Sequence, residues 1–294
     1  MTEVKPTAII GLGYVGLPLA QAAVDVGIRI IGFDINERAV NQLAAGQSPI
    51  SDIDDDGIAA MLAKGFEPTS DASRLDECGT FIICVPTPLS EDQGPDLTAV
   101  KSAAATLIPH LANGDLVVLE STTYPGTTEE VVAPILAESG LQVPAQVKLA
   151  FSPERVDPGN ATYGITNTPK VVGGLDESSS EAARGFYSRF CDTVVVAKGA
   201  REAELAKLLE NTYRHVNIAL INELAILSHE LDIDVWDAIR CAATKPFGFQ
   251  AFYPGPGVGG HCIPIDPNYL SHHVRSRLGH TFRFIELAQD INSA

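Results

Sequence analysis

The chain has 294 residues, 45% of them hydrophobic and 19% charged, which is ordinary for a globular protein and enough for about two domains. Lys and Arg number 20 against 37 Asp and Glu, giving a formal net charge of −17. This charge argues against a nucleic-acid-binding surface or an anionic-membrane surface, so local features must hold any anionic ligand.

The cysteines and the apolar runs predict the cellular compartment of the protein. Its 5 cysteines are scattered without a C-x-x-C pair, so we expect neither a disulfide framework nor a metal site. No basic segment followed by an apolar stretch opens the chain, and no apolar run is long enough to cross a bilayer. These features predict a protein of the reducing cytoplasm that contacts neither nucleic acid nor membrane.

The first elements form a βαβ unit. Residues 7–10 read as a short buried strand, which runs into Gly11-Leu-Gly-Tyr-Val-Gly16. Residues 17–26 have helical spacing, and residues 29–33 read as a second strand that ends at Asp34. A strand, a glycine turn, a helix and a second strand in this order predict a nucleotide-binding unit of about thirty residues.

Strands and helices continue to alternate up to residue 197. Buried strands are predicted at 80–85, 116–119, 147–151, 170–174 and 193–197, and a helix at 176–190. This alternation predicts an α/β fold with a doubly wound, parallel, Rossmann-type sheet in residues 1–197. The acidic run at residues 52–56 lacks EF-hand ligand spacing, so it is predicted as a solvated loop rather than a cation site.

Residues 198–294 differ in kind and predict an all-helical domain. Residues 201–231 contain no Gly or Pro and keep helical spacing of apolar side chains throughout. A helix of about thirty residues exceeds the globular average, so we expect it to span between domains or to pair with a partner subunit. A further helix is predicted from Thr281 to the end of the chain.

The glycine motif predicts a dinucleotide site. Gly11 permits the tight turn, Gly13 lets the backbone approach a pyrophosphate, and Gly16 permits close packing of the helix. Asp34 would accept hydrogen bonds from the adenosine ribose and repel a 2′-phosphate, which favours NAD over NADP although Arg38 lies nearby. FAD uses the same fingerprint and ranks below NAD; the glycines could alternatively serve the turn alone. The residues expected to contact NAD are Gly11, Gly13, Tyr14, Val15, Gly16, Asp34, Arg38, Pro86, Thr87 and Thr122.

A second motif, residues 259–267, places a thiol beside glycines. Cys262 follows a glycine pair and precedes Asp266 by four residues. If a helix opens at Cys262, its free N–H groups would favour the thiolate, with an acid or base one turn away. A covalent nucleophile is one interpretation; a small buried core residue is the other.

Taken together, the motifs resemble the UDP-glucose/GDP-mannose dehydrogenase family almost from end to end. The blocks that carry the resemblance are residues 11–16, 85–88, 120–123, 152–155, 207–211 and 257–262. Residues 244–257 are most similar to the branch that oxidises UDP-N-acetylglucosamine, and Ile265 stands where UDP-glucose enzymes carry a lysine. Enzymes for UDP-N-acetylmannosamine share the Gly-Gly-His-Cys block and are the closest alternative; oxidation of UDP-glucose is the other.

The resemblance implies a four-electron oxidation of the sugar C6 alcohol to a carboxylate, with two NAD and one water, that supplies surface polysaccharide precursors. Cys262 would add to the aldehyde intermediate and carry it to a thioester. Lys207 and Asn211, one helical turn apart, would stabilise the developing oxyanion. Asp266 would assist proton transfer through a water or by pairing with Lys207, or would only cap a helix.

The resemblance also implies roles for residues near C6 and the sugar. Thr122 and Glu154 would handle water and protons there, with Glu154 as general base for thioester hydrolysis. Pro158 replaces a second family glutamate, so Arg155 is expected to bind substrate instead. His261 and Tyr253 either contact the sugar or only support the loop. The expected substrate-binding residues are Glu154, Arg155, Lys207, Asn211, Tyr253, Gly257, Gly260 and His261.

The resemblance further implies a homodimer formed through residues 201–235. Family members continue into a third, Rossmann-like domain that helps to bind uridine diphosphate. We therefore expect these 294 residues to bind NAD but to oxidise UDP-sugars poorly or not at all. A module that binds NAD without turnover is the alternative from another functional class, and the intact set of Cys262, Lys207, Asn211 and Asp266 argues against it.

Overall fold

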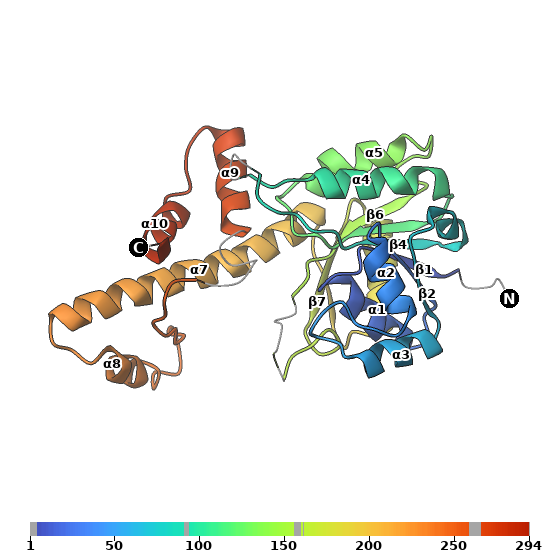
Figure 1. The fold of residues 1–294 in the computed structure, drawn as a ribbon. Helices are drawn as coiled ribbons and strands as arrows, with labels where there is room; N and C mark the ends of the chain where they lie inside the picture. The colour runs from blue at the N-terminus through green and yellow to red at the C-terminus, as the bar shows by residue number, and fades with distance from the viewer. Residues whose placement is uncertain (1–4, 91–93, 156–159, 161, 259–265, 294) are drawn as a thin grey trace. The chain divides into compact units, whose positions relative to one another are not determined.

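The computed structural model describes residues 5–90, 94–155, 160, 162–258 and 266–293 (Figure 1). The chain divides into two compact units. The first unit comprises Met1–Thr87 and Asp96–Lys207, and the second comprises Pro88–Pro95 and Leu208–Ala294. The division predicted at residues 197 and 198 stays a prediction.

Within the described residues, the first unit holds an eight-stranded sheet with the strand order β3-β2-β1-β4-β5-β6-β7-β8. The strands are β1 (Thr7–Ile10), β2 (Ile30–Phe33), β3 (Phe66–Thr69), β4 (Thr80–Ile83), β5 (Leu116–Leu119), β6 (Lys148–Phe151), β7 (Lys170–Gly174) and β8 (Val194–Val196). Pairing is parallel from β3 through β6. The chain order reverses direction between β1 and β4, and ligands bind at such a switch point in doubly wound sheets.

Helices cover both faces of this sheet. They are α1 (Gly16–Asp25), α2 (Glu37–Ala44), α3 (Asp55–Ala63), α4 (Thr98–Leu107), α5 (Ala133–Ala137) and α6 (Glu177–Tyr187), with short turns η1 (Ala72–Glu77), η2 (Ile108–His110) and η3 (Thr128–Val132). One apolar core lies between the sheet and α1, α3 and α6, and the other lies between the sheet and α4 and α5. Both faces of these strands are covered, so their side chains are apolar on both sides, which explains the continuous apolar runs. Burial of each Ile, Leu or Val side chain stabilises the fold by about 1.5–3 kcal/mol.

The doubly wound α/β fold is confirmed, with two departures in the sheet. Strand β3 was not predicted: among the described strands it pairs with β2 alone, and of its four residues only Phe66 is buried, so no apolar run marks it. Strand β7 runs antiparallel to β6, contrary to the parallel prediction. A parallel pair needs a crossover, usually a helix, and the described part of the β6–β7 connection contains none.

The prediction for the acidic run at residues 52–56 also needs correction. Helix α3 begins at Asp55, and the Asp54 carboxylate caps it by accepting a hydrogen bond from the Gly57 N–H at 2.8 Å. The loop prediction was therefore wrong for Asp55 and Asp56, which occupy the first helical turn. Carboxylates are favourable there because they face the unpaired N–H groups of the helix start.

The second unit consists, in its described residues, of helices joined by turns and loops. Its helices are most of α7 (Ala200–Glu230), followed by α8 (Val235–Ala242), α9 (Asp266–Leu278) and α10 (Arg283–Ser293). The long helix predicted at residues 201–231 and the last helix are confirmed. Within the described part of the chain, every helix is too short or too polar to cross a membrane.

Candidate active site

Apart from Arg38 and Lys207, which lie on helices, the predicted site residues of the first unit gather at one edge of the sheet. Each group directly follows the carboxyl end of a parallel strand, where doubly wound sheets bind ligands. The groups are Gly11–Gly16 after β1, Asp34 after β2, Pro86 and Thr87 after β4, Thr122 after β5, and Glu154 and Arg155 after β6.

The three glycines after β1 differ in what surrounds them. Gly11 has a φ of +97°, and a Cβ there would lie 2.7 Å from the Cys84 carbonyl oxygen. A Cβ on Gly16 would lie 1.9 Å from the Gly11 carbonyl oxygen, whereas a Cβ on Gly13 would meet nothing within 4 Å. Packing therefore requires the outer two glycines, and the open space beside Gly13 fits the approach of a pyrophosphate.

The Asp34 carboxylate is fixed against this glycine loop. Its Oδ2 accepts a hydrogen bond from the Leu12 N–H at 2.8 Å, and its Oδ1 accepts one from the Asn36 N–H at 2.9 Å. Asp34 is half-buried at the end of β2, and Arg38 is exposed on α2. An oriented carboxylate beside an open glycine loop fits the ribose and pyrophosphate of a dinucleotide without a 2′-phosphate.

The loops after β4 and β5 are joined by two side-chain hydrogen bonds. The Thr87 hydroxyl donates to the Thr122 carbonyl oxygen at 2.8 Å, and the Ser121 hydroxyl donates to the Val85 carbonyl oxygen at 2.7 Å. The structure therefore brings Thr87 and Thr122 together, as expected for residues assigned to one cofactor site. The role of Ser121 in joining these loops was not predicted from the sequence, where its only signal is that it is a polar residue beside a strand end.

Lys207 contacts the loop after β6. Its ammonium donates a hydrogen bond to the Glu154 backbone carbonyl at 2.5 Å, and the side chain is buried. The neighbouring Arg155 donates from Nη1 to the Pro169 carbonyl at 2.6 Å. An ammonium has three donors, so this bond leaves Lys207 with further hydrogen-bonding capacity.

In the second unit, Asn211 and Asp266 form a pair. Asn211 Nδ2 donates to Asp266 Oδ2 at 2.5 Å, and the Asp266 residue is 2% exposed at the start of α9. Asn211 follows Lys207 by one turn of α7, as predicted. Gly260, His261 and Cys262, and with them the predicted helix start at Cys262, lie outside the described residues.

Tyr253 and Gly257 lie in the loop that leads toward the Cys262 motif. The Tyr253 ring stacks on Trp236 of α8, with centroids 6.1 Å apart, and its side chain is largely exposed. Gly257 has a φ of +88°, and a Cβ there would lie 2.7 Å from the backbone oxygen of Asn292. The loop therefore passes too close to α10 for any residue other than glycine at position 257.

Replacing Gly257 with alanine is expected to lower the free energy of unfolding by about 1–3 kcal/mol, because the added methyl group meets backbone and the φ disfavours L-residues. Gly255→Ala is the matched control, since a Cβ there meets nothing within 4 Å. Urea unfolding of both variants measures the difference. Equal stability of the two variants would contradict the close approach of Gly257 to α10.

Three described cysteines are poor nucleophile candidates. Burial raises the pKa of Cys78 to about 12 and that of Cys191 to about 11. Burial, with the Glu120 carboxylate beside it, raises the pKa of Cys84 well above its ordinary value. Because the thiolate is the reactive form, these thiols are inert at neutral pH.

The buried Glu204 of α7 was not predicted from the sequence. Its Oε2 accepts from the Gly126 N–H at 2.6 Å, and its Oε1 accepts from the N–H and hydroxyl of Thr128 at 2.8 and 2.7 Å. Burial raises the pKa of Glu204 to about 7, although these hydrogen bonds oppose the shift. Glu204 thus caps the η3 turn and ties it to the start of α7.

The raised pKa predicts a pH-dependent stability. The pKa of Glu204 is higher in the folded state than in the unfolded state. Its stabilising contribution to the free energy of unfolding is therefore complete below about pH 4.5 and is lost as the pH rises through about 7. The difference in unfolding free energy between the native chain and Glu204→Gln should therefore be about 1–3 kcal/mol larger at pH 5 than at pH 8. Urea unfolding at both pH values tests this; a pH-independent difference would contradict it.

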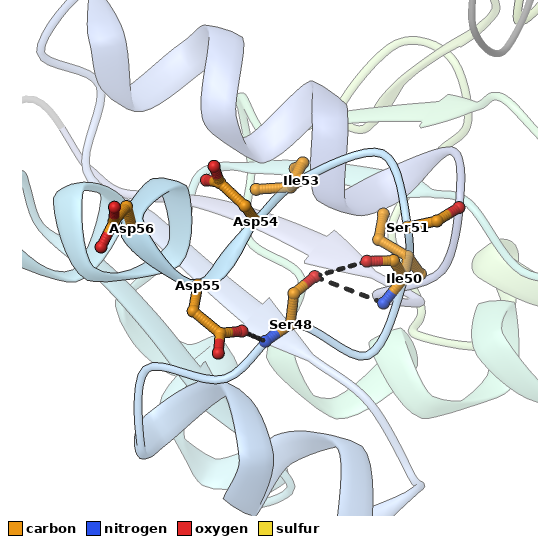
Figure 2. Close-up of a pocket in the computed structure, with 7 residues that line it drawn as sticks. All are labelled: Ser48, Ile50, Ser51, Ile53, Asp54, Asp55 and Asp56. Carbon is orange, nitrogen blue, oxygen red and sulfur yellow. Dashed lines mark hydrogen bonds between the residues drawn. The ribbon is translucent and has the colours of Figure 1, made fainter.

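A surface hollow of about 500 Å³ precedes α3 and is not a site candidate (Figure 2). Two of its carboxylates accept hydrogen bonds from backbone N–H groups: Asp55 from Ser48 at 2.8 Å, and Asp54 from Gly57 at 2.8 Å. None of the predicted site residues lines it. Across the described residues, no cluster of three His, Cys, Asp or Glu side chains could hold a metal ion.

Comparisons with known proteins show that the chain is similar in sequence and fold to several sugar-nucleotide dehydrogenases. The chain is 36% identical to the UDP-N-acetyl-D-mannosamine dehydrogenase of Methanococcus maripaludis over 99% of its length, and 41% identical to the UDP-N-acetyl-D-glucosamine 6-dehydrogenase of Salmonella typhi over 92%. It spans 65% and 63% of the lengths of these relatives. The structure of UDP-D-ManNAc dehydrogenase from Pyrococcus horikoshii superposes with a TM-score of 0.91 at 36% identity, covering 98% of this chain and 68% of that one.

Two parts of the chain also match known domains of one protein family. Residues 5–191 match the NAD binding domain of the UDP-glucose/GDP-mannose dehydrogenase family, and residues 201–294 match its central domain. The glycine loop and Asp34 therefore belong to an NAD-binding domain, as the sequence predicted. On these matches and the arrangement of the strand-end residues, the chain belongs to the UDP-glucose/GDP-mannose dehydrogenase family.

Proposed function

We propose that the protein oxidises the C6 alcohol of UDP-N-acetylglucosamine to the carboxylate of UDP-N-acetylglucosaminuronic acid, with NAD as the acceptor. The main support is the arrangement of the assigned residues at the carboxyl ends of β1, β2, β4, β5 and β6. The contact between Lys207 and the Glu154 carbonyl adds to it. Bound NAD would supply the hydride acceptor for both oxidations, held by the glycine loop, Asp34, Thr87 and Thr122.

The residues of this chain then have the following roles. After the first oxidation, the Cys262 sulfur bonds to the aldehyde carbon, and Lys207 and Asn211 stabilise the oxyanion of the thiohemiacetal. Asp266, hydrogen-bonded to Asn211, assists proton transfer. The second oxidation leaves a thioester. Water then attacks the thioester carbon, Glu154 accepts its proton, and the C–S bond breaks to release the Cys262 thiolate.

The oxidation balances as one alcohol, two NAD and one water giving one carboxylate, two NADH and three protons. The choice of sugar rests on the loop at residues 244–257 and on relatives of two kinds, one acting on UDP-N-acetylglucosamine and one on UDP-N-acetylmannosamine. Assay of the full-length protein with these two nucleotides and UDP-glucose tests the proposal. The highest kcat/KM should belong to UDP-N-acetylglucosamine, and preference for another nucleotide would transfer the assignment to it.

We also propose that the protein acts as a homodimer through residues 201–235. Along α7 and the turn after it, large apolar side chains are exposed on the single chain. They include Leu220, Leu224, Ile226, Leu227 and Leu231. An exposed apolar surface of this extent favours association. Light scattering at micromolar concentration should give twice the monomer mass, and a monomer mass would contradict the proposal.

A further inference from the structure

A buried ion pair lies in the core of the first unit, and NAD binding does not account for it. Glu120 directly follows β5 and Lys170 opens β7; the two residues are 1% and 5% exposed. The Lys170 ammonium contacts Glu120 Oε1. Stability alone explains such a pair poorly, because the cost of removing two charges from water often exceeds the attraction between them.

Neighbouring side chains hold the pair in place. The Tyr187 hydroxyl donates to Glu120 Oε1 at 3.0 Å, and the Cys84 thiol donates to Glu120 Oε2 at 3.6 Å. The Lys170 ammonium also lies 5.0 Å from the centroid of the Tyr187 ring. These contacts from α6 and from the residues that follow β4 and β5 leave the ammonium little freedom to move.

The fixed ammonium reaches the loop after β6. It donates a hydrogen bond to the Pro153 carbonyl at 3.3 Å, while Lys207 donates to the next carbonyl, that of Glu154, at 2.5 Å. On the preceding residue, the Ser152 hydroxyl donates to the Val171 carbonyl at 2.8 Å. Two lysines and one serine therefore fix three successive residues, of which the last carries the proposed general base.

The charge of Lys170 supports this arrangement. Burial lowers the pKa of Lys170, but the carboxylates of Glu120 and Glu154 raise it further, so the pKa lies above its ordinary value. The side chain is therefore an ammonium at neutral pH.

We propose that the Glu120–Lys170 pair positions Glu154 for thioester hydrolysis, with Lys170 acting through the Pro153 carbonyl and Glu120 holding Lys170. This inference rests on the proposed function, in which Glu154 takes the proton of the attacking water. Lys170 touches neither substrate nor cofactor in this scheme; it is a positioning residue. Displacing the carboxylate slows the hydrolytic step while the two oxidations before it continue, so the thioester on Cys262 should accumulate.

The test removes both charges together, because either single change leaves a buried unpaired charge that threatens folding. The variant is Glu120→Gln with Lys170→Met, and Lys170→Arg keeps the charge and the donor. Leu136→Ala, a fully buried position on α5, is the control for lost stability alone. The full-length protein is assayed with UDP-N-acetylglucosamine, UDP-N-acetylmannosamine and UDP-glucose, and intact-mass spectrometry during turnover measures the fraction of enzyme that carries a covalent adduct.

The double variant is expected to lose about tenfold or more in kcat and to accumulate the adduct, with the NAD dissociation constant within about twofold of native. Lys170→Arg should recover most of the native kcat, and Leu136→Ala should accumulate no adduct. Native kcat in the double variant, or a lower kcat without adduct, would overturn the proposal. Failure of the proposed function itself is distinct: the native protein would then produce NADH from none of the three nucleotides.

A second readout does not depend on activity. In the 294-residue chain, amide hydrogen exchange of Glu154 and Arg155 should accelerate at least tenfold in the double variant, because the loop loses the Lys170 donor. Leu136→Ala should leave the exchange of these two amides unchanged relative to neighbouring strands. Native exchange rates at Glu154 in the double variant would show that the pair does not hold the loop.

Discussion

Replacing Cys262 with serine in the full-length protein is expected to lower the rate of complete oxidation at least about a thousandfold while NAD affinity stays within about twofold of native. The reason is chemical: a thiolate forms at moderate pH and adds to the aldehyde, whereas a serine hydroxyl stays protonated and adds poorly. The thiol acts on the sugar, so the cofactor site after β1 and β2 is untouched. NADH absorbance, mass spectrometry of the uronic acid and NAD titration measure the three quantities.

Cys241→Ser is the matched control for this experiment. Cys241 is the exposed cysteine of the described residues and lies on α8. Its replacement should leave both turnover and NAD affinity at native values. Native turnover in the Cys262 variant, or equal losses in the two variants, would rule out covalent catalysis by Cys262.

Gly16→Ala is expected to lose stability, whereas Gly13→Ala is expected to stay folded and lose NAD affinity. A Cβ on Gly16 would overlap the Gly11 carbonyl at 1.9 Å, so β1 and α1 must move apart. We expect the unfolding free energy to fall by more than about 3 kcal/mol. A Cβ on Gly13 meets nothing in the protein, so stability should change by less than about 1 kcal/mol. The added methyl group would occupy the space left for the pyrophosphate and weaken NAD binding about tenfold or more.

Urea unfolding and NAD titration of the 294-residue chain separate these outcomes. Native NAD affinity in Gly13→Ala would contradict the placement of the pyrophosphate beside that residue. Native stability in Gly16→Ala would contradict the close contact between the start of α1 and the end of β1. The pair is informative because the two positions are three residues apart in one loop.

Much of the fold was predictable from the sequence because its signals are local. The bounds of β1, β5 and β7 agree with the predictions, since apolar runs mark them. Strand β3 was missed because Glu67, Pro68 and Thr69 look like a loop and only pairing with β2 makes them a strand. The direction of β7 was predicted wrongly, because strand direction depends on the path of the connection, which periodicity does not report.

The site was predictable where topology alone places residues together. Thr87 and Thr122 were assigned to one cofactor site, and the strand order explains their contact. The pairing of Asn211 with Asp266 joins residues 55 positions apart, and that of Lys170 with Glu120 joins the start of β7 to the residue after β5, so tertiary structure alone shows them. The roles of Gly260, His261 and Cys262 stay predictions, since these residues lie outside the described part of the chain.

The most direct test of the central claim is the yield of NADH per sugar nucleotide consumed by the full-length protein. We predict two NADH for each UDP-N-acetylglucosamine, with the uronic acid as product and no free aldehyde. One NADH per sugar with release of the aldehyde would contradict the covalent four-electron scheme.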